Sequence, residues 1–370
     1  MNLLFLNSAK VWGGNEKWVS MAMAALAPAH GVHLAYRHET VGRNMSLPKT
    51  RLPFLTPLDP YTIWRLSRMV HRLGISVLLP TKPADIITAG MVGRLCRVPT
   101  LARLGIVRRL GPYRRFAYET MADNVVVNAG VIKQVLEQNG YSRPERIHVI
   151  HNGLDSGPLE AALRTLAVAD LSQWTVTCTA NMIDRKGFDT LLRGFAHFRS
   201  LAGSPQARLV LIGDGERRPF LESLARDLGV AASTDFLGHL ADPYPRVAAA
   251  DVFVLCSRNE GIPNALLEAM YLKNAVIVTD VGGIGEVIVH GQNGFLIRPD
   301  DWRAVGQHLL TLYQDRHLTH ELQQRAHETV RHAFSATRMG QQLAGVCAAL
   351  AESSRGRRPG DPLGATPRRR

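Results

Sequence analysis

Two glutamates, Glu260 and Glu268, lie eight positions apart in the stretch SRNEGIPNALLEAM, on either side of a Gly-Ile-Pro-Asn turn. The preceding run DVFVLC predicts a strand, and Pro263 suits the first position of a helix, where its missing N–H is not needed. Backbone amides at such a helix start attract an anion such as phosphate. Glu268 would lie roughly 8 Å further along the helix axis. The spacing therefore favours a sugar-nucleotide ligand, whose pentose hydroxyls Glu268 can bind.

A plainer interpretation of the same stretch stays open. Carboxylates are common at helix starts, so Glu260 could cap the helix while Glu268 is exposed. The strands and helices predicted around these two side chains help to distinguish the two interpretations.

Short apolar runs alternate with amphipathic segments along the whole chain. In the front half the runs are LLFLN, VHLAY, SVLLP, PTLARL and DNVVVN, and in the back half they are WTVTCTA, ARLVLIG, DVFVLC, AVIVTD and NGFLI. This alternation predicts an α/β fold with parallel sheets covered by helices. The turn-rich segment HNGLDSGP (151–158) divides the two series. Two doubly wound domains are expected, with ligands beyond the carboxyl ends of the strands in the cleft between them.

The predicted boundaries follow from these patterns. A first domain covers 1–155, a second covers 156–335, and a closing helix covers 336–352. The tail 353–370 is rich in Pro, Gly and Arg and lacks apolar periodicity, so it is expected to be disordered. The four scattered cysteines show no metal-binding or disulfide spacing. Without a secretion signal or a membrane-spanning run, the protein is expected in the cytosol, with membrane contact only from its surface.

The positive charge is concentrated in the front half. Residues 1–150 hold 20 Lys and Arg against 8 Asp and Glu, whereas residues 151–352 hold 18 against 22. Seven arginines crowd into one stretch: Arg94, Arg97, Arg103, Arg108, Arg109, Arg114 and Arg115. Such a cluster would attract an anionic membrane surface or a phosphate-bearing acceptor, and the alternative is a solvated charged face. Nucleic acid is not expected as a partner, because aromatic residues do not interleave with the cluster.

Several further motifs accompany the two glutamates. The chain carries VWGGNEKW near its start, then VIHNGLD, NMIDRKGFDTLLRGFA, ARLVLIGDGERRPFLESLARDLG and AVIVTDVGGIGEVIVHGQNGFLIRPDD. Together with EGIPNALLEA they resemble retaining GT-B glycosyltransferases of family 4. The resemblance covers most of residues 1–350 and is most specific between about 175 and 300. It implies two Rossmann-like domains that face a central cleft, the first binding the acceptor and the second the nucleotide-sugar donor.

The resemblance also implies roles for individual residues. Glu268 would hold the ribose hydroxyls, and Glu260 would lie near the donor sugar together with the backbone of Gly261 and Ile262. Lys186 would pair with the diphosphate. The expected catalytic residues are Glu260 and Lys186, and the expected donor-binding residues are Gly13, Gly14, Asn181, Arg185, Lys186, Glu260, Gly261, Ile262, Pro263, Asn264 and Glu268.

Two positions depart from the family pattern. An arginine usually lies five residues before the lysine, where this chain has Asn181, and neighbouring Arg185 would compensate. The family also often has a histidine in its first domain, but residues 72–147 contain none. Arg108 or Arg109 would be the substitute, unless both are ordinary surface arginines.

The resemblance implies transfer of a hexose-like sugar from a nucleotide-sugar to a saccharide or lipid-linked acceptor, with retained configuration. Cell-surface polysaccharide or lipopolysaccharide synthesis is the expected setting. No D-x-D metal motif occurs in the chain, so neither a metal nor another cofactor is expected, and helix amides and Lys186 would stabilise the departing diphosphate. The alternatives are a non-catalytic scaffold with this fold, a related epimerase, or a basic protein that binds membranes or nucleic acid.

Overall fold

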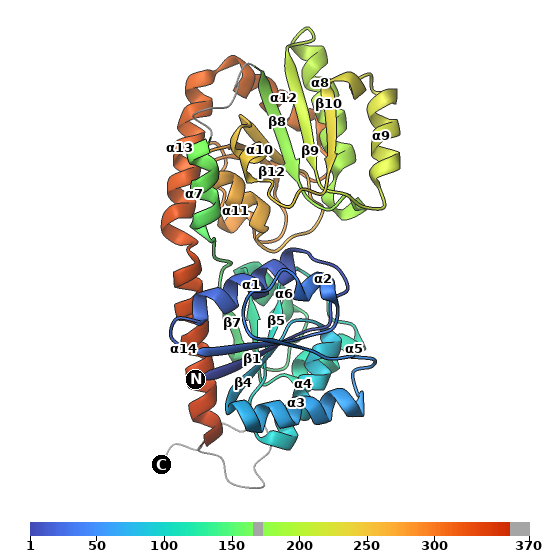
Figure 1. Cartoon of the computed structure of the whole chain (residues 1–370). Helices are drawn as coiled ribbons and strands as arrows, with labels where there is room; N and C mark the ends of the chain where they lie inside the picture. Colours follow the sequence, from blue (N-terminus) through green and yellow to red (C-terminus); the bar gives the residue numbers. More distant parts are fainter. Residues whose placement is uncertain (166–172, 356–370) are drawn as a thin grey trace. The chain divides into compact units, whose positions relative to one another are not determined.

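The computed structural model describes residues 1–165 and 173–355. Its contacts divide the chain into two compact units. The first unit contains Met1–Gly153 and the segment from Ala336 onward, and the second contains Leu154–Ser335. Both units are α/β, with helices packed around parallel strands (Figure 1). The α/β fold class predicted from the sequence is therefore confirmed.

The first unit is built on parallel strands at its centre. They are β1 (Asn2–Asn7), β2 (Gly31–Tyr36), β3 (Lys49–Arg51), β4 (Ile75–Pro80), β5 (Leu101–Leu104), β6 (Asn124–Val127) and β7 (Ile147–Val149). One sheet has the order β3-β2-β1-β4 and the other β5-β6-β7. A parallel bridge between Leu78 and Thr100 joins β4 to the start of β5. The resulting order reverses between β1 and β4, as in doubly wound dinucleotide-binding folds.

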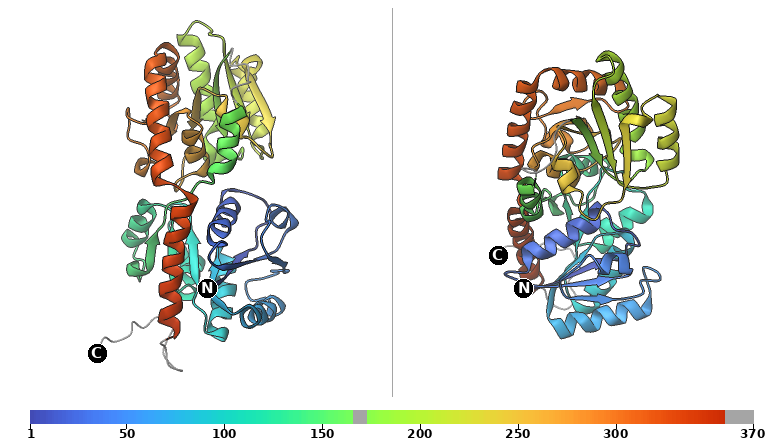
Figure 2. Two further views of the ribbon diagram at one scale, coloured as in Figure 1. Left: turned by 60° about the vertical axis from the view of Figure 1, so that its left-hand side comes forward. Right: turned by 45° about the horizontal axis from the view of Figure 1, so that its top comes forward.

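Helices cover the strands of the first unit. They are α1 (Gly14–Leu26), α2 (Glu39–Gly42), α3 (Pro60–Leu73), α4 (Pro83–Cys96), α5 (Pro112–Arg115), the π-helical η1 (Phe116–Met121), α6 (Gly130–Gln138) and the 3-10 turn η2 (Pro144–Arg146). The last helix, α14 (Ala336–Arg355), also belongs here. Its apolar face, with Met339, Leu343 and Cys347, shares a core with Phe5 and Trp18. Both views of Figure 2 show α14 running alongside the strands of this unit.

The second unit repeats the same winding in one sheet. Its strands are β8 (Trp174–Thr179), β9 (Ala207–Ile212), β10 (Thr234–Gly238), β11 (Val252–Leu255), β12 (Ala275–Thr279) and β13 (Phe295–Ile297). They lie in the order β10-β9-β8-β11-β12-β13. All these pairs are parallel. Because β11 returns to the far side of β8, the order reverses between these two strands, and the loops that follow them diverge to opposite faces.

Helices on both faces complete the second unit. They are α7 (Ser156–Thr165), α8 (Phe188–Leu201), α9 (Arg218–Asp227), α10 (Tyr244–Ala248), α11 (Asn264–Tyr271), α12 (Trp302–Gln314) and α13 (Arg316–Ala333). The 3-10 turns η4 (Asp184–Lys186), η5 (Ala231–Ser233) and η6 (Ile284–Glu286) lie in the connections. The helix face of Phe195 and Phe198 is fully buried, as is Phe253 on the central strand.

The apolar runs identified in the sequence form the central strands of both units and also the edge strand β13. Three strands lie outside those runs: β3, β7 and β10, and each is at the edge of its sheet. An edge strand has a neighbour on one side only, so it needs fewer apolar residues. The closing helix extends to Arg355, three residues beyond its predicted end. The predicted disordered tail begins within that helix, and the rest of it, 356–370, lies outside the described residues.

Candidate active site in the second unit

The strands β8 and β11, between which the order reverses, end in the loops that carry the predicted donor-binding residues. The chain leaves β8 through residues 180–183, forms η4 and enters α8. From β11 it passes through residues 256–263 into α11. Ligands of doubly wound sheets bind beyond the carboxyl ends of the strands at this point. Both loops therefore lie at the carboxyl edge of the sheet, where a ligand is expected.

Glu260 pairs with two cations across these loops. Its Oε1 lies 2.5 Å from Lys186 Nζ and 3.2 Å from an Nη of Arg185. The carboxylate is buried, which acts to raise its pKa, but the charges of Lys186 and Arg185 outweigh burial and hold the pKa of Glu260 below its usual value. The carboxylate is thus ionised at neutral pH and fixes both cations at the edge of the sheet.

Arg258 connects the loop after β11 to the loop after β8 through ion pairs and hydrogen bonds. Its guanidinium pairs with Asp189 at 2.9 Å and with Asp300 at 2.7 Å, and it donates to the carbonyl of Asp184. The backbone adds a hydrogen bond from Arg258 N–H to the carbonyl of Arg185, 2.8 Å long. The sequence analysis gave no role to Arg258. The available signal was an arginine two residues after the apolar run DVFVLC.

Gly187 brings the Lys186 turn against the end of β11. It has φ +62°, and a Cβ built on it would lie 2.0 Å from the carbonyl oxygen of Cys256. Only glycine fits this left-handed position at such close approach. The loop after β12 also contacts the loop after β11, since Gly283 N–H donates to the carbonyl of Gly261 at 3.0 Å. Backbone packing therefore fixes the position of both charged loops.

Helix α11 begins one residue later than predicted. Pro263 is its N-cap, with φ −76° and ψ 131°, and Asn264 is the first helical residue. The Pro263 side chain makes no capping hydrogen bond, because it has no polar group. Glu268 lies on the second turn of α11 and is buried, with 8% of its surface exposed. The interpretation of Glu268 as an exposed surface residue is therefore wrong.

Asn181 lies on the same loop as Lys186 but is exposed. Its backbone carbonyl accepts from the N–H of Ile183, 2.8 Å away. The cation that joins Lys186 at Glu260 is Arg185, as its proximity in the sequence suggested. Whether Asn181 contacts the donor stays a prediction.

A second polar cluster in the first unit

The corresponding reversal in the first unit, between β1 and β4, also carries a polar cluster. Asn7 donates to Glu16 Oε1 at 3.2 Å and to Thr81 Oγ1 at 3.3 Å. Lys82 Nζ lies 3.7 Å from the same glutamate oxygen. Gly13 is the N-cap of α1, and a Cβ there would lie 3.4 Å from Glu16 Oε2. Gly13 and Gly14 thus lie beside this cluster, and their contact with the donor stays a prediction.

Arg103 is a buried cation next to that cluster, which the sequence analysis counted only as part of a surface patch. Its guanidinium stacks on Trp18, 4.4 Å from the ring centre, and donates to Asn15 at 2.7 Å and Asn152 at 3.3 Å. Within residues 1–165 and 173–355 it has no carboxylate within ion-pair distance, and burial lowers its pKa to about 10. A Cβ on Gly105 would lie 2.5 Å from it. The available signal was a single charge inside the apolar strand LARL.

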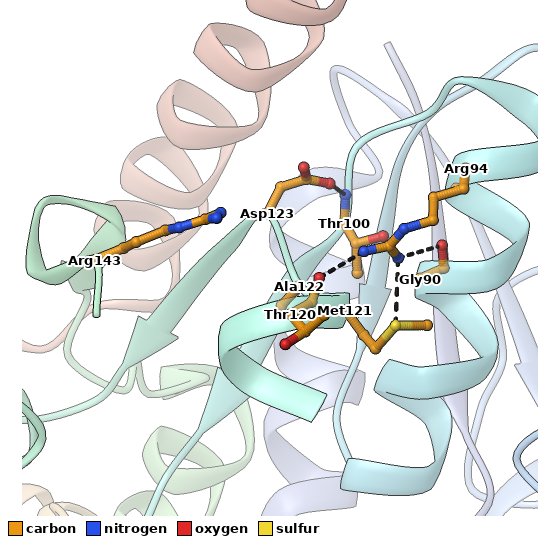
Figure 3. A pocket seen from close by; sticks show the side chains of 9 residues that line it. Gly90, Arg94, Thr100, Thr120, Met121, Ala122, Asp123 and Arg143 are labelled. Atoms are coloured by element: carbon orange, nitrogen blue, oxygen red, sulfur yellow. Dashed lines mark hydrogen bonds between the residues drawn. The ribbon is translucent and has the colours of Figure 1, made fainter. Parts of the chain in front are cut away.

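The predicted basic cluster does not form one surface. Arg103 is buried, which contradicts its assignment to an exposed patch. Arg94 lies at a small pocket and donates to the carbonyls of Gly90 and Thr120 (Figure 3). Arg115 donates to the carbonyl of Gly140 and pairs with Glu119 at 2.9 Å. Arg94 and Arg115 thus satisfy backbone carbonyls within their own unit, whereas Arg103 donates to the side-chain oxygens of Asn15 and Asn152.

Asp85 makes the stability of the first unit depend on pH. It is fully buried and accepts from Ser8 N–H at 3.0 Å through Oδ2, and among the described residues its Oδ1 has no hydrogen-bond partner. Burial raises its pKa from 3.8 to about 6. The folded state thus holds the proton more tightly than the unfolded state. This contribution to stability is fully present below pH 3.8 and is lost as pH rises through about 6.

We expect the pH dependence to disappear in Asp85→Asn, whose amide oxygen can still accept from Ser8 N–H. The free energy of unfolding of the parent, relative to the variant, should fall by about 2–3 kcal/mol between about pH 4 and pH 7. Urea titrations of both proteins across this range measure it. A difference that stays constant with pH would show that the pKa of Asp85 is the same in the folded and unfolded states.

Relatives and family

Comparison with known proteins identifies the family. The family model described as glycosyl transferases group 1 matches residues 173–315. The chain is similar to the lipopolysaccharide core biosynthesis glycosyltransferase LpsE of Rhizobium meliloti (strain 1021), with 32% identity over 271 residues, covering 73% of this chain and 77% of the relative. The chain therefore belongs to the glycosyl transferases group 1 family, and it is a glycosyltransferase.

Solved structures share the fold. Anabaena Alr3699/HepE in complex with UDP-glucose superposes with a TM-score of 0.79 at 21% identity, over 94% of this chain and 100% of that one. The sucrose-phosphate synthase of Thermosynechococcus elongatus superposes with a TM-score of 0.77 at 19% identity, over 95% and 99% of the two chains. The predicted GT-B class, with two Rossmann-like domains, is confirmed.

In residues 1–165 and 173–355, no group of three or more His, Cys, Asp and Glu side chains is arranged to hold a metal ion. Over the same ranges, no helix combines the length and apolarity that a bilayer span requires.

Proposed function

We propose that this protein is a retaining, metal-independent glycosyltransferase of family 4 that takes its sugar from a nucleotide-sugar. The observation that carries the proposal is the cluster of Lys186, Arg185 and Glu260 at the carboxyl end of the sheet, beside the start of α11. Two fixed cations and a helix start suit a diphosphate. Glu268, buried one turn further along α11, suits the ribose hydroxyls.

The chemistry follows from these charges. When the bond between the sugar and the diphosphate breaks, negative charge accumulates on the diphosphate oxygens. Lys186 and the amides at the start of α11 stabilise that charge without moving, because Glu260 already orients the lysine. If the acceptor attacks from the side on which the diphosphate leaves, a diphosphate oxygen takes the proton of the acceptor hydroxyl, and the configuration is retained. Glu260 and Glu268 then bind the donor instead of acting as an acid and base pair.

The proposed donor carries UDP, and the proposed acceptor is a saccharide attached to a membrane lipid. The donor follows from the bound UDP-glucose in the similar structure, and the acceptor from the printed role of the relative in lipopolysaccharide core biosynthesis. We assign acceptor binding to residues 1–155 and donor binding to residues 156–335. The reaction would take place in the cytoplasm, at the inner face of the membrane.

The ribose assignment can be tested with Glu268→Gln. Loss of a charge-assisted hydrogen bond weakens binding by about 1.5–3 kcal/mol, so the Kd for the donor should rise about 10- to 150-fold. UDP-, GDP- and ADP-sugars are first screened for thermal stabilisation of the parent, and the best one is then titrated by calorimetry.

Glu216→Gln is the matched control, because Glu216 is an exposed glutamate of the same unit. It should bind the donor like the parent. If Glu268→Gln also binds like the parent while remaining folded, Glu268 does not hold the ribose.

A further inference from the structure

Helix α3 presents an aromatic and basic stripe to solvent. Tyr61 and Trp64 are about half exposed, at 50% and 51%, and Arg65, Arg68 and Arg72 continue the stripe at helical spacing. The opposite stripe, with Leu66, Met69 and Val70, is buried in the core. Figure 1 shows α3 on the outside of the first unit, next to α4. About half of the surface of each ring is therefore open to solvent.

The loop before α3 adds apolar surface to the same end of the helix. Leu55 is 70% exposed and Leu58 is 57% exposed. The loop folds back onto the first turn, because Phe54 N–H donates to Thr62 Oγ1 at 3.2 Å and Leu55 N–H to Asp59 Oδ2 at 3.4 Å. The two leucines thus flank the aromatic end of the stripe. We call Leu55, Leu58, Tyr61, Trp64, Arg65, Arg68 and Arg72 the α3 face.

The arginines of the α3 face are not neutralised within the fold. Arg65 donates to the hydroxyl of Tyr61 at 3.0 Å, and Arg68 stacks over Trp64 at 5.1 Å. In residues 1–165 and 173–355, neither these two nor Arg72 lies within ion-pair distance of a carboxylate. Between residues 52 and 81 the only acid is Asp59, which is buried as the N-cap of α3.

An arginine also stacks on an aromatic ring in the second unit, but there carboxylates lie beside the arginines. Arg217 stacks over the exposed ring of Phe220 at 4.1 Å and pairs with Asp184 at 3.6 Å. Its neighbour Arg218 pairs with Glu222 at 2.8 Å. That pair is neutralised by local carboxylates, whereas the α3 face keeps its positive charge.

We propose that the α3 face docks the protein on an anionic lipid bilayer. Trp and Tyr side chains prefer the level of the head groups, where their rings are partly buried and their polar atoms stay hydrated. An amphipathic helix with basic residues beside its aromatic residues lies flat in this zone. Leu55 and Leu58 enter the acyl boundary, and the three arginines bind lipid phosphates. This proposal is independent of the donor site.

The test is co-sedimentation of the full chain with vesicles of phosphatidylcholine alone or of equal parts of phosphatidylcholine and phosphatidylglycerol. The parent should sediment only with the anionic vesicles. Removal of one arginine should lower partitioning about fivefold, and the double variant Trp64→Ser, Arg68→Gln should lower it at least about tenfold. The matched control, Phe220→Ser with Arg217→Gln, should sediment like the parent.

Thermal unfolding of the same α3 variant should follow that of the parent, which shows that the first unit is folded. Loss of the folding transition together with vesicle binding would mean that the variant is misfolded, and Arg68→Gln alone then provides the test. The proposal is overturned if the parent stays in the supernatant with both vesicles, which would assign the α3 face to a soluble partner. It is equally overturned if the α3 variant sediments like the parent.

Discussion

Replacement of Lys186 by methionine should lower kcat/KM by about 10²–10³, the usual effect of removing one preorganised donor from a developing negative charge. Methionine keeps much of the length of the side chain and removes only the ammonium group. Glu260 keeps its second partner, Arg185, at 3.2 Å, so the buried carboxylate is not left without a cation. The measurement is the initial rate of sugar transfer, or of donor hydrolysis, with the nucleotide-sugar that stabilises the parent.

Separate measurement of kcat and KM shows whether Lys186 acts on the departing diphosphate or only on donor binding. A group that acts on the departing diphosphate lowers kcat and kcat/KM together, whereas one that only binds the ground state raises KM. Lys273→Met is the control, since Lys273 is an exposed lysine of the same unit. A Lys186→Met protein that is folded and transfers sugar at the rate of the parent would remove the lysine from the mechanism.

Gly187→Ala should cause a large loss of stability in the second unit. The added methyl would lie 2.0 Å from the carbonyl oxygen of Cys256, at a residue with φ +62°. Overpacking costs about 1–3 kcal/mol, and a left-handed backbone costs an alanine about 1–2 kcal/mol more. We therefore expect the free energy of unfolding to fall by about 2–5 kcal/mol, measured by urea denaturation.

Gly203→Ala separates the cost of the steric contact from the cost of the left-handed backbone. Gly203 has a nearly identical φ of +67°, but a Cβ there would meet nothing within 4 Å. Its cost should be the backbone part alone, about 1–2 kcal/mol, with transfer activity unchanged. Gly187→Ala should also lose activity, because Lys186 must move with its neighbour. Equal losses of stability in the two variants would mean that the Cys256 carbonyl yields without cost.

The fold class and the family could be predicted from local sequence patterns alone. Central strands of a parallel sheet are buried on both faces, so they appear as continuous apolar runs that can be read locally. The loops after two such runs, at Lys186 and at Glu260, could be assigned to one edge of the sheet because parallel strands all end there. Edge strands such as β3, with the sequence KTR, carried too little apolar signal.

The burial and pairing of the charged side chains, by contrast, could be established only from the folded structure. Arg103 and Arg109 look alike in the sequence, yet one stacks on Trp18 inside the first unit and the other is exposed. Arg258 forms ion pairs with Asp189 and Asp300, which are far from it along the chain. The energy of a charge depends on its distance from other charges and from water. Both are set by residues remote in the sequence, so no local pattern reports them.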